Sequence, residues 1–144
     1  MSDVISPPAP FAINVRVYYE DTDASGVVYH ASYLRWFERA RTEWLRHIGF
    51  EQHSLRDQLG VLFTVSNIKV DYRRPARLDQ QLQVQTRVLE ARRVSLTFEQ
   101  TVRRPEDTEW LARAQVKVGC VDVQRFRPCA LPKAFKDILK VSFI

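Results

Sequence analysis

Three carboxylates, a glycine and a histidine lie close together in one short stretch of the sequence. The carboxylates are Glu20, Asp21 and Asp23, and they are followed by Gly26 and His30. A glycine permits a sharp turn after Asp23, and a helix that starts near His30 would leave backbone N–H groups free to bind negative charge. A carboxylate beside such donors could attack a carbonyl or activate water while the donors stabilise the developing oxyanion. The stretch therefore predicts acyl transfer to water.

Each of these residues, taken alone, has a simpler explanation. Acidic residues ahead of a helix often serve as N-caps or loop turns, and a single histidine is more often structural than catalytic. Ser25 lacks the G-x-S-x-G setting of a serine hydrolase. His30, His47 and His53 have no HExxH or similar ligand spacing, so we expect no metal and no other cofactor.

The helix that would carry His30 at its start is the clearest element of the sequence. Its apolar residues recur every three or four positions and so share one face: Tyr33, Phe37, Ala40, Trp44 and Ile48. Gly49 follows where a glycine can end a helix. Leu34, Trp36 and Leu45 widen the apolar surface, which predicts a helix that is buried over much of its circumference.

Alternating apolar and polar residues predict five strands around this helix. The first is expected at 13–19, ahead of the carboxylates, and the others at 67–72, 81–88, 94–102 and 110–118. Such alternation is typical of antiparallel strands with one covered face. Residues 133–140 predict a last short helix, and 141–144 are more typical of a strand. We therefore expect an α+β fold in which one antiparallel sheet curls around one helix, and whose open sheet edges favour dimerisation by sheet extension.

Length and composition limit the class of protein. At 144 residues and 45% hydrophobic content, the chain is expected to form one domain with its own core. The first ten residues hold three prolines and lack the features of a signal peptide, and no apolar run is long enough to span a membrane. We expect a cytoplasmic protein whose contact with a membrane, if there is any, is peripheral only. Cys120 and Cys129 form no CxxC pair and are interpreted as packed thiols.

Arginine dominates the basic residues. The net charge is +5, and arginines occur in pairs such as Arg73 with Arg74 and Arg92 with Arg93. The planar guanidinium suits phosphate, so a phosphorylated ligand or an acidic partner is one interpretation. Solvated charge on the outer face of strands is the simpler one. Because no recognised nucleic-acid motif accompanies the charge, we expect no nucleic-acid partner.

Several segments together resemble a known family. The run YEDTDASGVVYHASYL at 19–34, followed by FERAR at 37–41, resembles the signature of hotdog-fold acyl-CoA thioesterases. The most similar branch is the Tol-Pal-associated YbgC branch of the 4-hydroxybenzoyl-CoA thioesterase-like family. The resemblance extends over nearly the whole chain and includes YRRPA at 72–76 and RVSLTF at 93–98.

The resemblance implies a fold and a set of site residues. A flexible segment at 1–12 would precede a single hotdog domain at 13–144. Asp23 matches the family's catalytic carboxylate, and His30 matches the residue whose backbone N–H polarises the thioester carbonyl and whose side chain is also implicated in catalysis. Ser25 stands where close relatives often have glycine. The residues expected to bind substrate are Gly26, Val27, Tyr29, Tyr33, Arg73, Arg74, Arg92 and Arg93.

The first hypothesis is therefore an acyl-CoA thioesterase that releases free acid and CoA and acts as a homodimer or homotetramer with sites shared between subunits. The alternative is a non-catalytic hotdog module that binds acyl chains or acyl carrier protein. A hotdog dehydratase ranks third, because Glu38 and Glu43 are more typical of solvated helix residues than of an acid partner. The intact Asp23 favours the thioesterase. The acyl chain, the choice of CoA or acyl carrier protein as donor, and a nucleophilic or general-base role for Asp23 stay open.

Overall fold

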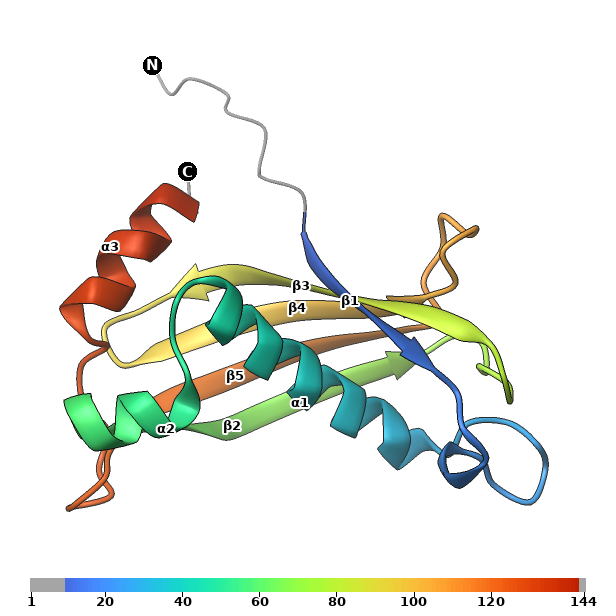
Figure 1. Cartoon of the computed structure of the whole chain (residues 1–144), viewed down its shortest axis with the longest axis horizontal. Helices are drawn as coiled ribbons and strands as arrows, with labels where there is room; N and C mark the ends of the chain where they lie inside the picture. The colour runs from blue at the N-terminus through green and yellow to red at the C-terminus, as the bar shows by residue number, and fades with distance from the viewer. Residues whose placement is uncertain (1–9, 143–144) are drawn as a thin grey trace.

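The computed structural model describes residues 10–142. Five strands form one antiparallel sheet in the order β1-β3-β4-β5-β2. The strands are β1 (Phe11–Arg16), β2 (Val61–Tyr72), β3 (Gln81–Ala91), β4 (Ser95–Arg103) and β5 (Ala112–Asp122). The helices are α1 (His30–His47), the short α2 (Gln52–Ser54), which continues into a π-helical turn at Leu55–Leu59, and α3 (Lys133–Ser142). Figure 1 shows α1 crossing one face of the sheet, with α3 at the end of the molecule far from the loop before α1. The predicted α+β arrangement is confirmed.

The apolar face of α1 is buried as its spacing predicts. Tyr33, Phe37, Ala40 and Trp44 are buried, and the helix ends where Gly49 adopts a φ of +101°. Trp36 and Leu45, which were expected to widen this apolar face, are buried as well. The same expectation was wrong for Leu34, which is exposed. Leu34 follows Tyr33 directly, so its side chain is turned about 100° from that of Tyr33 around the helix axis.

The core lies between α1 and the inner face of the sheet. Fully buried side chains of β3, β4 and β5 meet Trp36 and Phe37 of α1 there: Leu82, Val84, Val102, Ala112 and Val116. Burying a large apolar side chain stabilises the fold by about 1.5–3 kcal/mol. Gln100 is a buried polar side chain in this layer, and its amide donates to the Phe37 carbonyl and the Thr86 hydroxyl, each at 2.9 Å. The helix is thus attached to the sheet by packing and by hydrogen bonds.

All five strands differ from the prediction at their ends. β3 continues to Ala91 rather than ending at residue 88, β4 is displaced by one residue, and β5 spans Ala112–Asp122 rather than 110–118, so Trp110 lies outside it. β2 begins at Val61 rather than at residue 67, and its pairing with β5 shifts between Val65 and Asn67. β1 begins at Phe11, inside the segment expected to be flexible, and ends at Arg16 rather than at residue 19. It ends early because the chain turns into a 3-10 helix at Tyr19–Asp21.

The C-terminal segment is helical through Ser142, so the strand expected at 141–144 was wrong for residues 141 and 142, and residues 143 and 144 lie outside the described part. Phe135 and Leu139, one helical turn apart, are both buried. The Phe135 ring lies 5.3 Å from that of Phe50 and 5.5 Å from that of Phe63. These contacts attach α3 to the core. Among residues 10–142, no helix is both long and apolar enough to cross a membrane.

Candidate active site

Asp21 is a structural carboxylate that closes the loop before α1. Its side chain accepts the N–H of Tyr18 at 2.9 Å and lies 3.8 Å from the guanidinium of Arg35. Its backbone carbonyl accepts the N–H of Tyr29 at 2.8 Å. Because Asp21 is buried and bound from both sides of the loop, it serves the fold and is removed from the set of candidate catalytic carboxylates.

Asp23 lies in a tight turn and is exposed. Its N–H donates to the Val27 carbonyl at 2.9 Å, and Gly26 adopts a φ of +83°, which favours glycine. The hydroxyl and the backbone N–H of Ser25 both donate to Asp23 Oδ1. These two hydrogen bonds from Ser25, the hydroxyl first, hold the pKa of Asp23 below its ordinary value. Asp23 is therefore ionised at neutral pH, with Oδ1 held by the turn.

The start of α1 at His30 supplies hydrogen-bond donors. Its N-cap residue, Tyr29, has an extended backbone and makes no side-chain hydrogen bond to the first turn. The first N–H groups of a helix have no acceptor within the helix and lie at the positive end of its dipole. The start of α1 can therefore bind the oxygen of a polarised carbonyl.

Two tyrosines hold this helix start against the connection between β2 and β3. The Tyr72 hydroxyl donates to the His30 carbonyl at 3.1 Å, and the Tyr33 oxygen accepts the N–H of Ala76 at 3.0 Å. The two rings lie 5.3 Å apart. Burial raises the pKa of both tyrosines, so each keeps its proton at neutral pH. Tyr33 and Tyr72 therefore fix the position of His30 relative to the sheet.

Asp23 and His30 line the same open pocket, which has a volume of about 340 Å³. The remaining lining residues are Val28, Tyr33, Tyr72, Arg73, Arg74 and Pro75. The fold thus brings together five of the residues singled out in the sequence, namely Asp23, His30, Tyr33, Arg73 and Arg74. A carboxylate and a helix start in one pocket form an arrangement that can hydrolyse an ester or thioester.

The other predicted substrate residues do not line this pocket. Gly26 forms the turn after Asp23, Val27 pairs with Arg77, and Tyr29 precedes the helix with its ring 4.3 Å from that of His30. Arg92 and Arg93 follow the end of β3 that is far from this pocket. A strand of eleven residues separates its two ends by roughly 35 Å.

Sequence reasoning did not assign Tyr72 or Trp110 to the site. The guanidinium of Arg73 lies over the Trp110 ring, 4.2 Å from its centre, and that of Arg113 lies 4.9 Å from it. Glu109 is 3.4 Å from Arg74. Tyr72 could have been found from the sequence, because it ends an alternating strand directly before Arg73 and Arg74. Trp110 could not, because it reaches these arginines only through the connection between β4 and β5.

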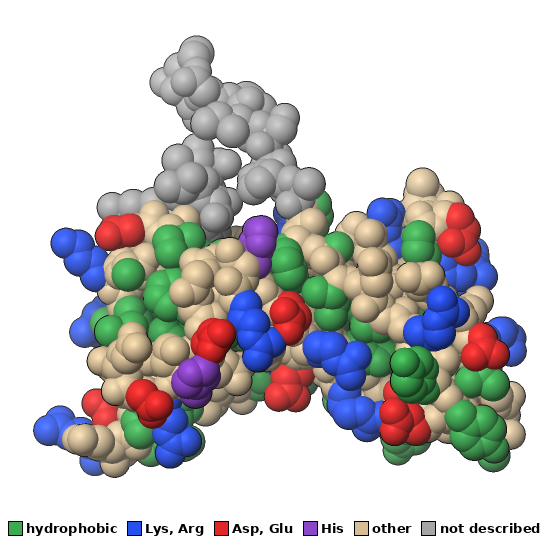
Figure 2. Space-filling view, viewed as in Figure 1, with side chains coloured by type: hydrophobic (Ala, Val, Ile, Leu, Met, Phe, Trp, Pro, Cys, Tyr) green, Lys and Arg blue, Asp and Glu red, His purple; other side chains and the backbone are tan. Residues whose placement is uncertain are grey.

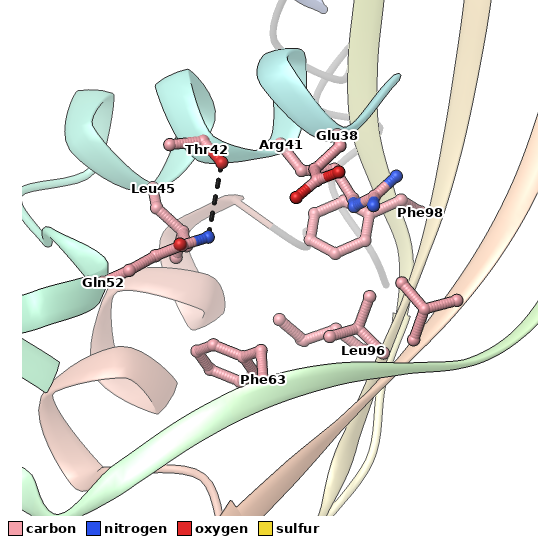
Figure 3. Close-up of a pocket in the computed structure, with 10 residues that line it drawn as sticks. Glu38, Arg41, Thr42, Leu45, Gln52, Phe63, Leu96 and Phe98 are labelled. Carbon is pink, nitrogen blue, oxygen red and sulfur yellow. Dashed lines mark hydrogen bonds between the residues drawn. The ribbon is translucent and has the colours of Figure 1, made fainter. Parts of the chain in front are cut away.

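A second pocket, of about 260 Å³, lies between the middle of α1 and the inner face of the sheet (Figure 3). Its apolar walls are formed by Leu45, Phe63, Val65, Leu96, Phe98 and Val118, and its polar residues are Glu38, Arg41, Thr42 and Gln52. Arg41 donates to Gln100 at 2.9 Å, and burial lowers the pKa of its guanidinium. This pocket is separate from the one that contains Asp23, and its walls suit an apolar group.

Charge is mixed over the surface. Figure 2 shows acidic side chains between the arginines and lysines on the face it displays, instead of one continuous basic patch. Several arginines are paired with neighbouring carboxylates, including Arg87 with Glu99 at 2.9 Å and Arg104 with Asp107 at 2.7 Å. Most of these exposed arginines are therefore solvated or locally paired, and those beside the Asp23 pocket have the best position to contact a ligand.

Comparison with known proteins identifies relatives over most of the chain. The family model described as the thioesterase-like superfamily matches residues 17–139. The chain is 48% identical over 126 residues to acyl-CoA thioesterase YbgC from Haemophilus influenzae, and this alignment covers 88% of this chain and 91% of that protein. It is 52% identical over 120 residues to acyl-CoA thioester hydrolase YbgC from Escherichia coli O6:H1, and this alignment covers 83% of this chain and 88% of that protein. A solved structure described as a probable thioesterase from Bartonella henselae superimposes with a TM-score of 0.80 at 35% identity, covering 86% of this chain and all of the other.

Proposed function

The chain belongs to the thioesterase-like superfamily, adopts the hotdog fold and is an acyl-CoA thioesterase, and we propose that Asp23 and the start of α1 at His30 form its catalytic site. The predicted resemblance to the YbgC branch is confirmed. The observation that carries the proposal is that an ionised carboxylate and an uncapped helix start line one pocket. A module that only binds acyl chains has no need of a carboxylate beside the thioester carbonyl.

In the proposed reaction, the thioester carbonyl oxygen accepts the His30 N–H, which stabilises the oxyanion as it forms. As a general base, Asp23 removes a proton from water, and the water oxygen bonds to the carbonyl carbon. The C–S bond then breaks, CoA leaves as a thiolate, and the thiolate takes up the proton. As a nucleophile, Asp23 would instead bond to the carbonyl carbon, expel the same thiolate and leave a mixed anhydride that water hydrolyses to free acid.

The activity is tested with a panel of acyl-CoA esters of different length, aliphatic and aromatic, while free thiol is followed. We expect turnover of at least one class of ester. Binding of every ester without release of thiol would instead support the non-catalytic module. In rapid-quench experiments, a burst of CoA ahead of free acid would identify the nucleophilic route.

Arg73 and Arg74 are the arginines that we propose contact the phosphates of CoA. Both line the Asp23 pocket and share Glu109 as a partner. A phosphate group can accept two hydrogen bonds from a guanidinium, so it can compete with this exposed carboxylate. In the single chain Arg92 and Arg93 are too far from Asp23 to contact the same ligand, and they could do so only from a second subunit.

We propose that two chains pair through β2. This strand is an edge of the sheet, and Val65 and Ile68 on it are 49% and 39% exposed. Antiparallel pairing of two β2 strands about a twofold axis would place the Tyr72 end of one beside the Phe63 end of the other. The second pocket of one subunit would then adjoin the Asp23 pocket of its partner and could receive the acyl group.

The remaining details are predictions that rest on the sequence or on the resemblance. They are assembly of dimers into a homotetramer, a cytoplasmic location, association with the Tol-Pal system, and acyl carrier protein as an alternative acyl donor. Turnover of an acyl group carried on acyl carrier protein, measured beside the same acyl group on CoA, tests the last of these.

A further inference from the structure

The fold brings the two cysteines of the chain together, although nothing in the proposed reaction uses them. Cys120 lies in β5, and Cys129 lies in the segment that leads from β5 to α3. Their sulfur atoms are 3.6 Å apart, and the Cys129 N–H donates to the Cys120 carbonyl at 2.9 Å. Because a disulfide has a sulfur separation of about 2.05 Å, the two sulfur atoms would have to approach each other by about 1.5 Å.

We propose that Cys120 and Cys129 are a redox-sensitive pair that forms an intramolecular disulfide when the protein meets a peroxide. The two thiols differ in access, because Cys129 is partly exposed and Cys120 is fully buried. Cys129 is therefore the thiol that peroxide reaches first, and Cys120 is the thiol that resolves the product.

The chemistry balances with hydrogen peroxide as the oxidant. The Cys129 thiolate attacks one peroxide oxygen, the O–O bond breaks, and a sulfenic acid forms with release of water after protonation. Cys120 then attacks the sulfur of this sulfenic acid, the S–O bond breaks, and a second water leaves. Two thiols and one peroxide thus give one disulfide and two waters.

Burial raises the pKa of the Cys120 thiol to about 12. Since the thiolate is the attacking form, we expect the second step to speed up as pH rises.

The disulfide would tie down the segment that carries α3. Leu131 donates its N–H to the Arg93 carbonyl at 2.9 Å, and Phe135 of α3 packs against Phe63, which lines the second pocket. A covalent link between Cys129 and β5 would restrict opening of this segment. We therefore expect slower amide hydrogen exchange in α3 after oxidation.

The test uses the full chain, which has only two cysteines. Treatment with hydrogen peroxide is expected to remove both titratable thiols, lower the intact mass by about 2 Da and give a peptide that links Cys120 to Cys129. Dithiothreitol should restore both thiols. A sulfinic acid at Cys129 with Cys120 still reduced, or a disulfide between the Cys129 residues of two chains, would overturn the proposal.

Two matched variants assign the order of attack. In Cys129→Ser the buried Cys120 thiol is expected to resist peroxide. In Cys120→Ser the partly exposed Cys129 thiol is expected to proceed to a sulfinic acid, about 32 Da heavier. Rapid oxidation of Cys120 in the first variant would contradict the assigned order. Circular dichroism checks that both variants fold, and the mass of the oxidised natural protein decides the proposal if one of them does not.

Discussion

Asp23 differs from its acidic neighbours in where its carboxylate lies. We expect Asp23→Asn to lower kcat for acyl-CoA by about 10²–10⁴-fold, the range for loss of a general base, because the amide can neither take a proton nor attack. The matched control is Glu20→Gln, an exposed neighbour that does not line the pocket, and it should keep kcat within about twofold. Thiol release and circular dichroism are measured for both variants. Equal turnover of Asp23→Asn and the natural protein would refute the assignment of Asp23.

Ser25 is expected to set the pH range in which Asp23 can act. Its two hydrogen bonds lower the pKa of Asp23 below the ordinary value of 3.8, so activity that needs the carboxylate is present at neutral pH and is lost only as pH falls through that lowered pKa. Ser25→Ala removes the hydroxyl bond but keeps the backbone bond. The acid limb of kcat/KM should then move to higher pH. An identical limb in the two proteins would show that the Ser25 hydroxyl does not control this ionisation.

Arg73 and Arg74 are expected to act through charge. Raising ionic strength should increase KM for acyl-CoA more than KM for a short thioester without the nucleotide, because salt screens exposed charges. Arg73→Gln with Arg74→Gln should remove most of this difference. Arg87→Gln is the control, because Arg87 pairs with Glu99 and does not line the Asp23 pocket. The same salt response for both substrates would contradict a phosphate-binding role.

At the scale of single elements, α1 depends on the turn that ends it. Gly49 has a φ of +101°, and a Cβ there would meet no atom within 4 Å. The cost of Gly49→Ala is therefore conformational, about 1–2 kcal/mol, and should lower the melting temperature by several degrees. Gly119→Ala is the control, because its Cβ would lie 3.9 Å from the Thr64 carbonyl, an ordinary contact without positive φ. Equal melting temperatures for the two variants would contradict this explanation.

Periodicity predicted α1 and most of the sheet, and it failed where the backbone interrupts it. In β2 the extra residue Ser66 lies between Val65 and Asn67, and the inward positions change from odd numbers, such as Phe63, to even ones, such as Ile68. A strict alternation therefore detects only the second half of the strand. The C-terminal helix was predicted two residues too short, because Val141 is β-branched and is also typical of a strand, whereas the structure continues the helix through Ser142.

The candidate site could be derived from the sequence where its residues are close in sequence. Asp23, Gly26 and His30 come from one stretch, so a glycine turn and the expected start of the helix are enough to place them together. Tyr72 arrives through the pairing of β2 with β5, which depends on register over the sheet, and Trp110 arrives through the connection between β4 and β5. The cysteines illustrate the same limit, since only the pairing of the segment after β5 with Cys120 brings Cys129 within 3.6 Å.

For the whole molecule, the two edges of the sheet are unlike each other. β2 has twelve residues with exposed apolar side chains at Val65 and Ile68, whereas β1 has six and exposes Asn14 and Arg16. A long edge with apolar side chains is the one that proteins pair or cover. We therefore predict a homodimer through β2, with a mass twice that of the chain at all assay concentrations.

The decisive variant is Ile68→Lys, which would place two positive charges close together across the twofold axis, because this residue is near the middle of β2. We expect it to shift the protein toward monomer and to lower activity in parallel, since each Asp23 pocket would lose the neighbouring subunit. Asn14→Lys adds the same charge to the β1 edge and should leave the dimer intact. Light scattering over a concentration series, with activity measured on the same samples, distinguishes the two edges. A fully active monomer would contradict both the pairing through β2 and a site shared between subunits.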